Sequence, residues 1–172
     1  MKNRRSIRLQ EYDYSQPGAY FVTVCTRNRE CLFGEIAGGQ MILNDAGWMV
    51  EAVWDALPIR FPELELDAFV VMPNHIHSIM ITNVGAIHEL PLPPNDPIHR
   101  RRMLIPKIIG YAKMNAAKRI DQSRNTQGNP VWQRNYYERV IRDENELNGV
   151  RQYIADNPAN WDSDGENPNA KL

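Results

Sequence analysis

The sequence has no apolar run approaching the ~20 residues that a membrane-spanning helix needs, so we expect no transmembrane segment. The basic N-terminus, residues 1–8, is followed by no apolar stretch, and we therefore expect no secretory signal. Cysteine is scarce: Cys25 and Cys31 form no metal-type pattern and are interpreted as reduced thiols of a cytoplasmic protein. The 172 residues, 42% of them hydrophobic, fit one compact domain with a substantial core.

The chain also lacks net positive charge, and its formal charge of −1 argues against a generally basic nucleic-acid binder. The charges are nevertheless separated along the chain. Residues 100–142 contain eleven Lys and Arg against two acids, whereas residues 31–70 contain seven acids against Arg60 alone. This predicts a dipolar surface whose basic side suits a polyanion, although a solvated helix face explains the same block.

The stretch 69–81, FVVMPNHIHSIMI, is typical of two apolar strands joined by a Pro-Asn turn. Successive side chains of a strand point to opposite faces, so His75 and His77 project the same way. Two imidazoles about 7 Å apart along one strand face can share a divalent metal. Two polar residues at a strand entrance are the alternative, because a His-x-His triplet alone is a weak signal.

The remaining pattern predicts further strands and helices. Strands are expected at 19–26, 66–72 and 75–82, a hairpin at 31–36 and 40–43, and helices at 44–61, 100–120 and 143–157. The proline-rich segment 83–99 is expected to be a loop and 162–172 a polar, disordered tail. We therefore predict a single domain over residues 1–161.

The last predicted helix offers what two histidines lack, a further ligand for a metal ion. Tyr153 and Asn157 are four residues apart and hence share one helix face. The asparagine amide oxygen is a hard donor suited to Mg²⁺ or Mn²⁺, and the phenol would then lie beside a metal-bound phosphate. From the spacing alone, packing of the Tyr153 ring at a helix–sheet interface is the favoured explanation, since the spacing does not distinguish this residue among seven tyrosines.

Aromatic and basic residues are interleaved in the segment 131–141, VWQRNYYERVI. Such interleaving suits nucleic acid, through phosphate pairing and base stacking, although a surface strand covering the core has a similar composition. The candidate DNA-contacting residues are Arg4, Arg5, Arg8, Arg100, Arg101, Arg102, Lys107, Lys113, Lys118, Trp132, Arg134, Tyr136 and Arg139.

Four sequence stretches occur in a fixed order, and their combination is a more specific signature than any one of them alone. They are Arg4–Arg8 with Gly18–Thr23, Met72–His77, Trp132–Glu138 and Tyr153–Pro158. The second resembles the His-hydrophobe-His (HUH) signature of single-tyrosine transposases. Together, from about residue 4 to Trp161, the stretches resemble the REP-associated tyrosine transposases, a bacterial branch of that superfamily.

The resemblance implies a ferredoxin-like α+β fold: an antiparallel sheet with helices packed on one face and the histidines on a central strand. It implies that His75, His77 and Asn157 bind Mg²⁺ or Mn²⁺ and that Tyr153, on the C-terminal helix, is the nucleophile. The implied substrate is single-stranded DNA with a hairpin, the repetitive extragenic palindrome (REP), cleaved to a 5′-phosphotyrosine link and a free 3′-OH. A bacterial, cytoplasmic, nucleoid-associated protein is implied, and a monomer is favoured over a dimer.

Two other functions remain open at this point. A hydrolytic phosphoesterase would use metal-activated water in place of Tyr153, and a non-catalytic module would only bind hairpin DNA. Two-histidine phosphoesterases need a second His-x-Ser/Thr motif, and neither His88 nor His99 supplies one. That weighs against the first alternative.

Overall fold

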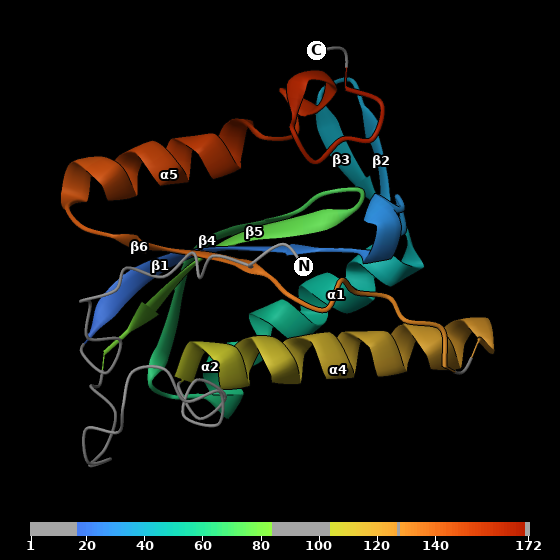
Figure 1. The fold of residues 1–172 in the computed structure, drawn as a ribbon, viewed down its shortest axis with the longest axis horizontal. Helices are drawn as coiled ribbons and strands as arrows, with labels where there is room; N and C mark the ends of the chain where they lie inside the picture. The colour runs from blue at the N-terminus through green and yellow to red at the C-terminus, as the bar shows by residue number, and fades with distance from the viewer. Residues whose placement is uncertain (1–16, 84–103, 127, 171–172) are drawn as a thin grey trace, which may run out of the picture.

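The computed structural model of the chain describes residues 17–83, 104–126 and 128–170 (Figure 1). Within this part, four antiparallel strands form a sheet in the order β4-β5-β1-β6, with bounds β1 Gly18–Cys25, β4 Leu64–Val71, β5 His75–Thr82 and β6 Tyr137–Ile141. Helix α1 (Asp45–Asp55) separates β1 from β4 along the chain, and α4 (Leu104–Arg124) separates β5 from β6. This βαββαβ order with an antiparallel sheet is the ferredoxin-like arrangement, which confirms the predicted α+β fold.

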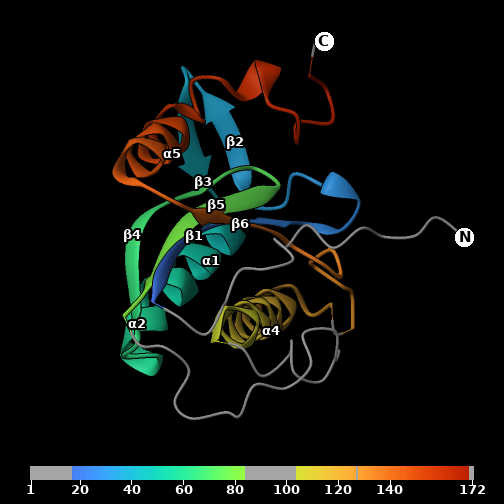
Figure 2. The ribbon, with the colours of Figure 1, turned by 60° about the vertical axis from the view of Figure 1, so that its left-hand side comes forward.

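Helices cover both faces of the sheet (Figures 1 and 2). Helices α1 and α4 share one face, as expected, where Val22, Ile76 and Met80 belong to the larger apolar core. Helix α5 (Glu144–Asp156) covers the opposite face, where Phe21 and Ile79 form a smaller core with the helix. The expectation of helices on a single face is therefore wrong for α5. Strands β1 and β5 carry apolar side chains on both faces, so both faces need a cover.

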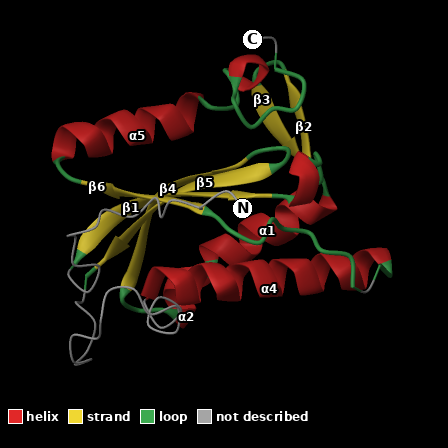
Figure 3. Ribbon diagram, in the orientation of Figure 1, coloured by secondary structure: helices red, strands yellow, loops and turns green. Residues whose placement is uncertain are grey.

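A hairpin of β2 (Gly34–Ala37) and β3 (Gln40–Leu43) stands beside the main sheet (Figure 3). Its turn residues Gly38 and Gly39 have φ values of 59° and 75°, a left-handed conformation that glycine adopts without strain. The predicted hairpin is thereby confirmed. Three short helices complete the described part: α2 (Leu57–Arg60), η1 (Arg27–Arg29) and η2 (Trp161–Ser163). No described helix combines the length and hydropathy needed to cross a bilayer.

Helix α5 begins where the sequence predicts, at a side-chain cap. Asp143 Oδ1 accepts a hydrogen bond from the Glu146 backbone N–H at 2.9 Å, and Glu146 Oε2 accepts from the Arg142 N–H at 2.9 Å. Arg151 then joins the helix to β4, because its Nε and Nη2 both donate to the Asp67 carboxylate, Nε at 2.7 Å. Asp67 lies where the β4–β5 register shifts between Leu66 and Phe69, and such an irregularity can re-aim a side chain. The pair helps to set the position of α5 over the sheet.

The C-terminal segment folds back rather than forming the predicted disordered tail, as far as it is described. Residues 162–170 lie near β2 and β3 at the end of the sheet (Figures 1 and 2). Arg29 Nη1 donates to the Gly165 carbonyl at 3.0 Å, and Arg29 Nε pairs with Glu166 Oε2 at 3.2 Å. The prediction fails because polar contacts hold this segment, and composition alone does not reveal them. The predicted loop at 83–99 lies outside the described residues except for Asn83, and the single-domain boundary stays a prediction.

Candidate functional site

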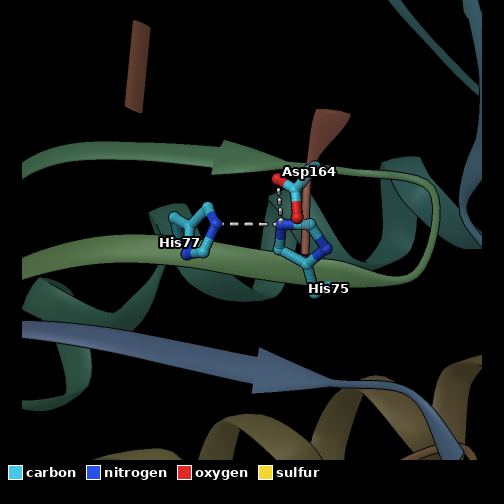
Figure 4. A group of neighbouring side chains, drawn as sticks. All are labelled: His75, His77 and Asp164. Carbon is cyan, nitrogen blue, oxygen red and sulfur yellow. Dashed lines mark hydrogen bonds and ion pairs between the residues drawn. The ribbon is translucent and has the colours of Figure 1, made fainter. Parts of the chain in front are cut away.

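His75 and His77 open strand β5, and both face the side of the sheet that α5 covers. Their exposed fractions are 0% and 3%, and their Nε2 atoms lie 3.0 Å apart (Figure 4). Two ligand atoms that each lie ~2.1 Å from one ion, at a right angle to one another, are about 3.0 Å apart. The spacing of the two imidazoles therefore fits joint coordination of one divalent cation.

Hydrogen bonds on the far side of each ring orient the imidazoles. His75 Nδ1 lies 2.8 Å from Asn74 Oδ1, and this amide is oriented by its own Nδ2, which donates to two backbone carbonyls. An amide oxygen only accepts, so His75 Nδ1 carries the proton and Nε2 carries the lone pair. His77 Nδ1 lies 2.8 Å from Thr23 Oγ1, which can accept in the same way. Both Nε2 atoms can thus present lone pairs to one point, the pattern of a metal-binding pair.

Burial keeps both imidazoles neutral. It lowers the pKa of His77 to about 2, with the neighbouring His75 acting in the same direction. Burial also lowers the pKa of His75, although the carboxylates of Asp164 and Glu166 oppose the shift. The neutral imidazole is the form that ligates metals.

The metal-free protein is expected to lose stability as the pH falls below about 6.5, the ordinary pKa of histidine. The pKa of His77 is about 2 in the folded chain, so between these values the unfolded chain binds more protons. The free energy of unfolding should fall by up to about 1.4 kcal/mol per pH unit for this histidine. Urea denaturation of EDTA-treated protein at a series of pH values measures this change in the free energy of unfolding. In His77→Asn, whose side chain does not titrate, the free energy of unfolding should depend less steeply on pH. An unchanged pH dependence would contradict the lowered pKa of His77 as its cause.

Helix α5 brings Tyr153 to the histidines. Tyr153 Oη lies 3.2 Å from His77 Nε2, and its ring packs edge-on against Phe21, with centroids 6.0 Å apart. The residue remains 47% exposed, which leaves a side of the phenol open to a substrate. Burial of the rest raises the pKa of the Tyr153 phenol, and the charges of Asp164 and Glu166 raise it further. The phenol is therefore protonated at neutral pH and needs activation to act as a nucleophile.

Asn157, one turn beyond Tyr153, lies in the same site and is 2% exposed. Its Nδ2 donates to Asp164 Oδ2 at 2.8 Å, while its Oδ1 is buried without a hydrogen-bond partner in the described part of the chain. An unsatisfied buried oxygen costs roughly 1–3 kcal/mol. The amide oxygen is the hard donor that the sequence analysis expects as the third ligand, so the residues present fit a divalent ion.

Asp164 is a site residue that the sequence analysis missed, because it falls in the expected disordered tail. Its Oδ2 lies 3.9 Å from His75 Nε2, and one ligand atom from each of His75, His77 and Asp164 lies within 4.8 Å of the others (Figure 4). The three residues form a buried group that can hold a metal ion. No periodicity or motif marks Asp164, since its place depends on how the tail folds back.

Two of the predicted DNA-contacting side chains are used inside the protein. Trp132 is 8% exposed, stacks at a tilt against Phe33, and donates its indole N–H to the Lys113 carbonyl at 3.0 Å. Lys113 Nζ in turn donates to the carbonyls of Gln133 and Arg134, the latter at 3.3 Å. These contacts tie the segment after α4 back to that helix. We therefore remove Trp132 and Lys113 from the set of candidate DNA contacts.

The other predicted contacts divide into three groups. Lys107, Lys118 and Arg134 are exposed and remain candidates. Arg139 is exposed but pairs with Glu146 at 3.3 Å, and Tyr136 is half-buried with its hydroxyl donating to a carboxylate. Outside the described residues lie Arg4, Arg5, Arg8, Arg100, Arg101 and Arg102.

Lys113→Ala should lower the free energy of unfolding by about 1–3 kcal/mol, because two carbonyls that accept from Nζ lose their donor. Lys118→Ala, an exposed change on the same helix, should stay within about 0.5 kcal/mol. Urea denaturation of both variants measures the difference. A stable Lys113→Ala protein whose DNA binding became less salt-dependent would restore Lys113 to the DNA-contacting set.

No protein-family model matches this sequence. A Haemophilus influenzae (strain ATCC 51907 / DSM 11121 / KW20 / Rd) protein, described as uncharacterized, is 40% identical over 169 residues, which cover 94% of this chain and 92% of that protein. A solved structure of a REP-associated tyrosine transposase bound to a REP hairpin covers 90% of this chain and 73% of its own, with a TM-score of 0.59 and 21% identity, and shares the fold. A crystal structure of a putative transposase from Deinococcus radiodurans R1 covers 86% of this chain and 95% of its own, with a TM-score of 0.48 and 16% identity. The identity and coverage of the first relative show that this chain belongs to the same protein family as the Haemophilus influenzae protein.

Proposed function

We propose that this chain is a metal-dependent DNA endonuclease and strand transferase that acts through a tyrosine nucleophile, as in the REP-associated tyrosine transposases. The observation that carries the proposal is the 3.2 Å separation of Tyr153 Oη and His77 Nε2, two residues 76 positions apart. A metal-binding pair alone would serve many reactions, and a tyrosine alone would be a packing residue. The fold shared with a transposase bound to a REP hairpin supports the substrate class, single-stranded DNA with a hairpin.

In the proposed reaction Tyr153 Oη attacks the scissile phosphorus in line, and the bond from phosphorus to the 3′-oxygen breaks. The phenol proton passes to solvent water, and the departing 3′-oxygen takes up a proton. Mg²⁺ or Mn²⁺, held by His75, His77 and Asn157, would supply charge stabilisation at the phosphoryl oxygen and favour deprotonation of the phenol. The 5′-phosphotyrosine link keeps the phosphodiester energy, so rejoining needs no ATP.

The protein's own contribution is orientation of the nucleophile. Phe21 supports the Tyr153 ring edge-on, and the Asp67–Arg151 pair holds α5 against β4. A nucleophile held near its attack position avoids much of the entropic cost of a bimolecular reaction. The exposed bases Lys107, Lys118 and Arg134 would bind phosphates of the DNA. We extend the proposal to a monomeric, cytoplasmic bacterial protein associated with the nucleoid.

The proposal is tested by mapping a covalent adduct on the wild-type protein. A REP-like hairpin with single-stranded flanks is labelled at its 3′ end, since the link retains the DNA on that side of the cut, and is incubated with the protein and Mn²⁺. We expect a product that survives denaturant. Trypsin should release residues 152–171, in which Tyr153 is the only tyrosine, so mass spectrometry of the DNA-linked peptide identifies the nucleophile.

The other outcomes contradict the proposal in distinct ways. Cleavage without an adduct would indicate a hydrolytic nuclease that uses water. Tight hairpin binding without metal-dependent cleavage, over several hairpin sequences, would indicate a non-catalytic DNA-binding protein. An adduct on a peptide other than 152–171 would place the nucleophile elsewhere.

A further inference from the structure

Asp164 is a buried carboxylate that the proposed reaction does not use. It is 7% exposed, and its Oδ2 lies 3.9 Å from His75 Nε2 (Figure 4). The same oxygen accepts from Asn157 Nδ2 at 2.8 Å. We propose that Asp164 is a further ligand of the divalent ion and that the folded-back tail, residues 161–167, is thereby a structural part of the metal site. The inference relies on the proposed function only for the histidine pair as metal ligands.

The buried Asp164 carboxylate has no cationic side chain paired with it in the described part of the chain. Within the described residues, no Lys or Arg forms an ion pair with Asp164, and Arg29, the base bound to the tail, pairs with Glu166 instead. Burying a carboxylate without a partner cation is costly. A divalent ion among these groups would compensate the buried charge.

The hydrogen bond between Asp164 and Asn157 points to the same ion. Because Asn157 Nδ2 donates to Asp164 Oδ2, the amide is oriented with Oδ1 elsewhere. That oxygen is buried and has no hydrogen-bond partner among the described residues. If Asp164 only held the tail in place, Asn157 Oδ1 would stay buried without a partner. An ion bound between the two residues would satisfy it. Two imidazole nitrogens, an amide oxygen and a carboxylate oxygen form a donor set suited to Mn²⁺, whose remaining coordination positions would stay available to phosphate oxygens.

Contacts on both sides of Asp164 hold the tail at the histidines. Arg29 binds the Gly165 carbonyl at 3.0 Å and the Glu166 carboxylate at 3.2 Å. Asn74 Nδ2 donates to the Glu166 carbonyl at 2.8 Å, while Asn74 Oδ1 accepts from His75 Nδ1 at 2.8 Å. Asn74 therefore orients the first histidine and fixes the tail at once. Loss of the Arg29 contacts should weaken metal binding without removing a ligand.

The test measures Mn²⁺ binding to the full-length, DNA-free chain by electron paramagnetic resonance. Asp164→Asn removes the charge and leaves one oxygen for the two donors that bind the carboxylate, Asn157 Nδ2 and the Glu166 backbone N–H. It should weaken Mn²⁺ binding roughly 10- to 100-fold. Asp162→Asn is the matched control, because it removes the same charge from an exposed position of the same tail, and it should change the affinity less than about twofold. Arg29→Ala should give an intermediate loss.

Two results would overturn the inference: wild-type affinity in Asp164→Asn, or equal losses in Asp164→Asn and Asp162→Asn. A measurement on the wild type needs no variant to fold. Paramagnetic Mn²⁺ should broaden the backbone amide resonances of residues 163–166 together with those of 75–77, and sharp tail resonances would also reject Asp164 as a ligand.

The proposed function fails separately from this inference. An absent Tyr153 adduct beside intact Mn²⁺ binding through Asp164 would contradict only the DNA-cleaving reaction. An adduct formed beside unchanged Mn²⁺ affinity in Asp164→Asn would contradict only the carboxylate ligand.

Discussion

Tyr153→Phe should abolish the covalent adduct and slow cleavage of hairpin-bearing single-stranded DNA by about 10⁴-fold or more, the scale of loss when a nucleophile is removed. Phenylalanine lacks the attacking oxygen but keeps the ring, which packs edge-on against Phe21 and lies 5.1 Å, centroid to centroid, from His77. The fold, Mn²⁺ binding and hairpin binding should therefore be preserved. Single-turnover cleavage with protein in excess of DNA measures the chemical step directly.

Tyr137→Phe is the matched control for this variant. Tyr137, on β6, is 38% exposed and also packs edge-on against Phe21, with centroids 6.3 Å apart. Removing a phenol of similar exposure from the same aromatic group should change the cleavage rate less than about twofold, because surface changes away from the reacting atoms have small effects. Retained cleavage in Tyr153→Phe, with loss in His75→Ala, would replace the tyrosine nucleophile by metal-activated water.

His75→Ala should weaken Mn²⁺ binding by about 100-fold or more and slow cleavage by about 10³-fold, because the ion supplies several kcal/mol of stabilisation to the transition state. His75 is the sharper choice of the two histidines, since His77 also contacts the Tyr153 hydroxyl. Hairpin binding should persist, because the candidate phosphate contacts are elsewhere on the molecule. Calorimetric titration with Mn²⁺ and single-turnover cleavage separate metal binding from catalysis.

Ser78→Ala provides the control for a buried change on the same strand. Ser78 is 1% exposed, and it projects to the face of β5 opposite the histidines because it is one residue beyond His77. This variant should bind Mn²⁺ and cleave DNA as the wild type does. EDTA should slow cleavage by the wild type as much as the His75→Ala substitution does. Added Mn²⁺ should restore cleavage by the EDTA-treated wild type but not by His75→Ala. Full cleavage by His75→Ala in the presence of EDTA would contradict a metal-dependent mechanism.

Local rules predict much of this protein correctly. The period of two along a strand places His75 and His77 on one face, and the four-residue spacing on α5 places Tyr153 beside Asn157. The cap at Asp143 and the hairpin turn at Gly38–Gly39 also depend only on neighbouring residues. Each of these features is determined by a few consecutive side chains and the backbone geometry they favour.

The errors concern residues whose partners are far away along the chain. Trp132 is a predicted DNA contact because aromatic and basic residues are interleaved at 131–141, and Lys113 is one because it belongs to the basic block 100–142. In the structure, each is hydrogen-bonded to the other's segment. Asp164 reads as part of a disordered tail, yet it is buried against His75. Composition describes what a side chain can do, but it does not say whether another part of the protein already uses it.

The sequence by itself determined most of the helices and strands of this protein, although not strand β6. It also determined the shared face of His75 and His77 and the helical spacing of Tyr153 and Asn157, because short-range sterics and periodicity control these features. Only the tertiary structure decided that α5 covers the histidine face, with Tyr153 Oη 3.2 Å from His77 Nε2, and that the tail returns with Asp164. Those placements depend on burying the second apolar face of the sheet and on the Asp67–Arg151 and Arg29–Glu166 pairs. Such contacts join residues that no local pattern connects.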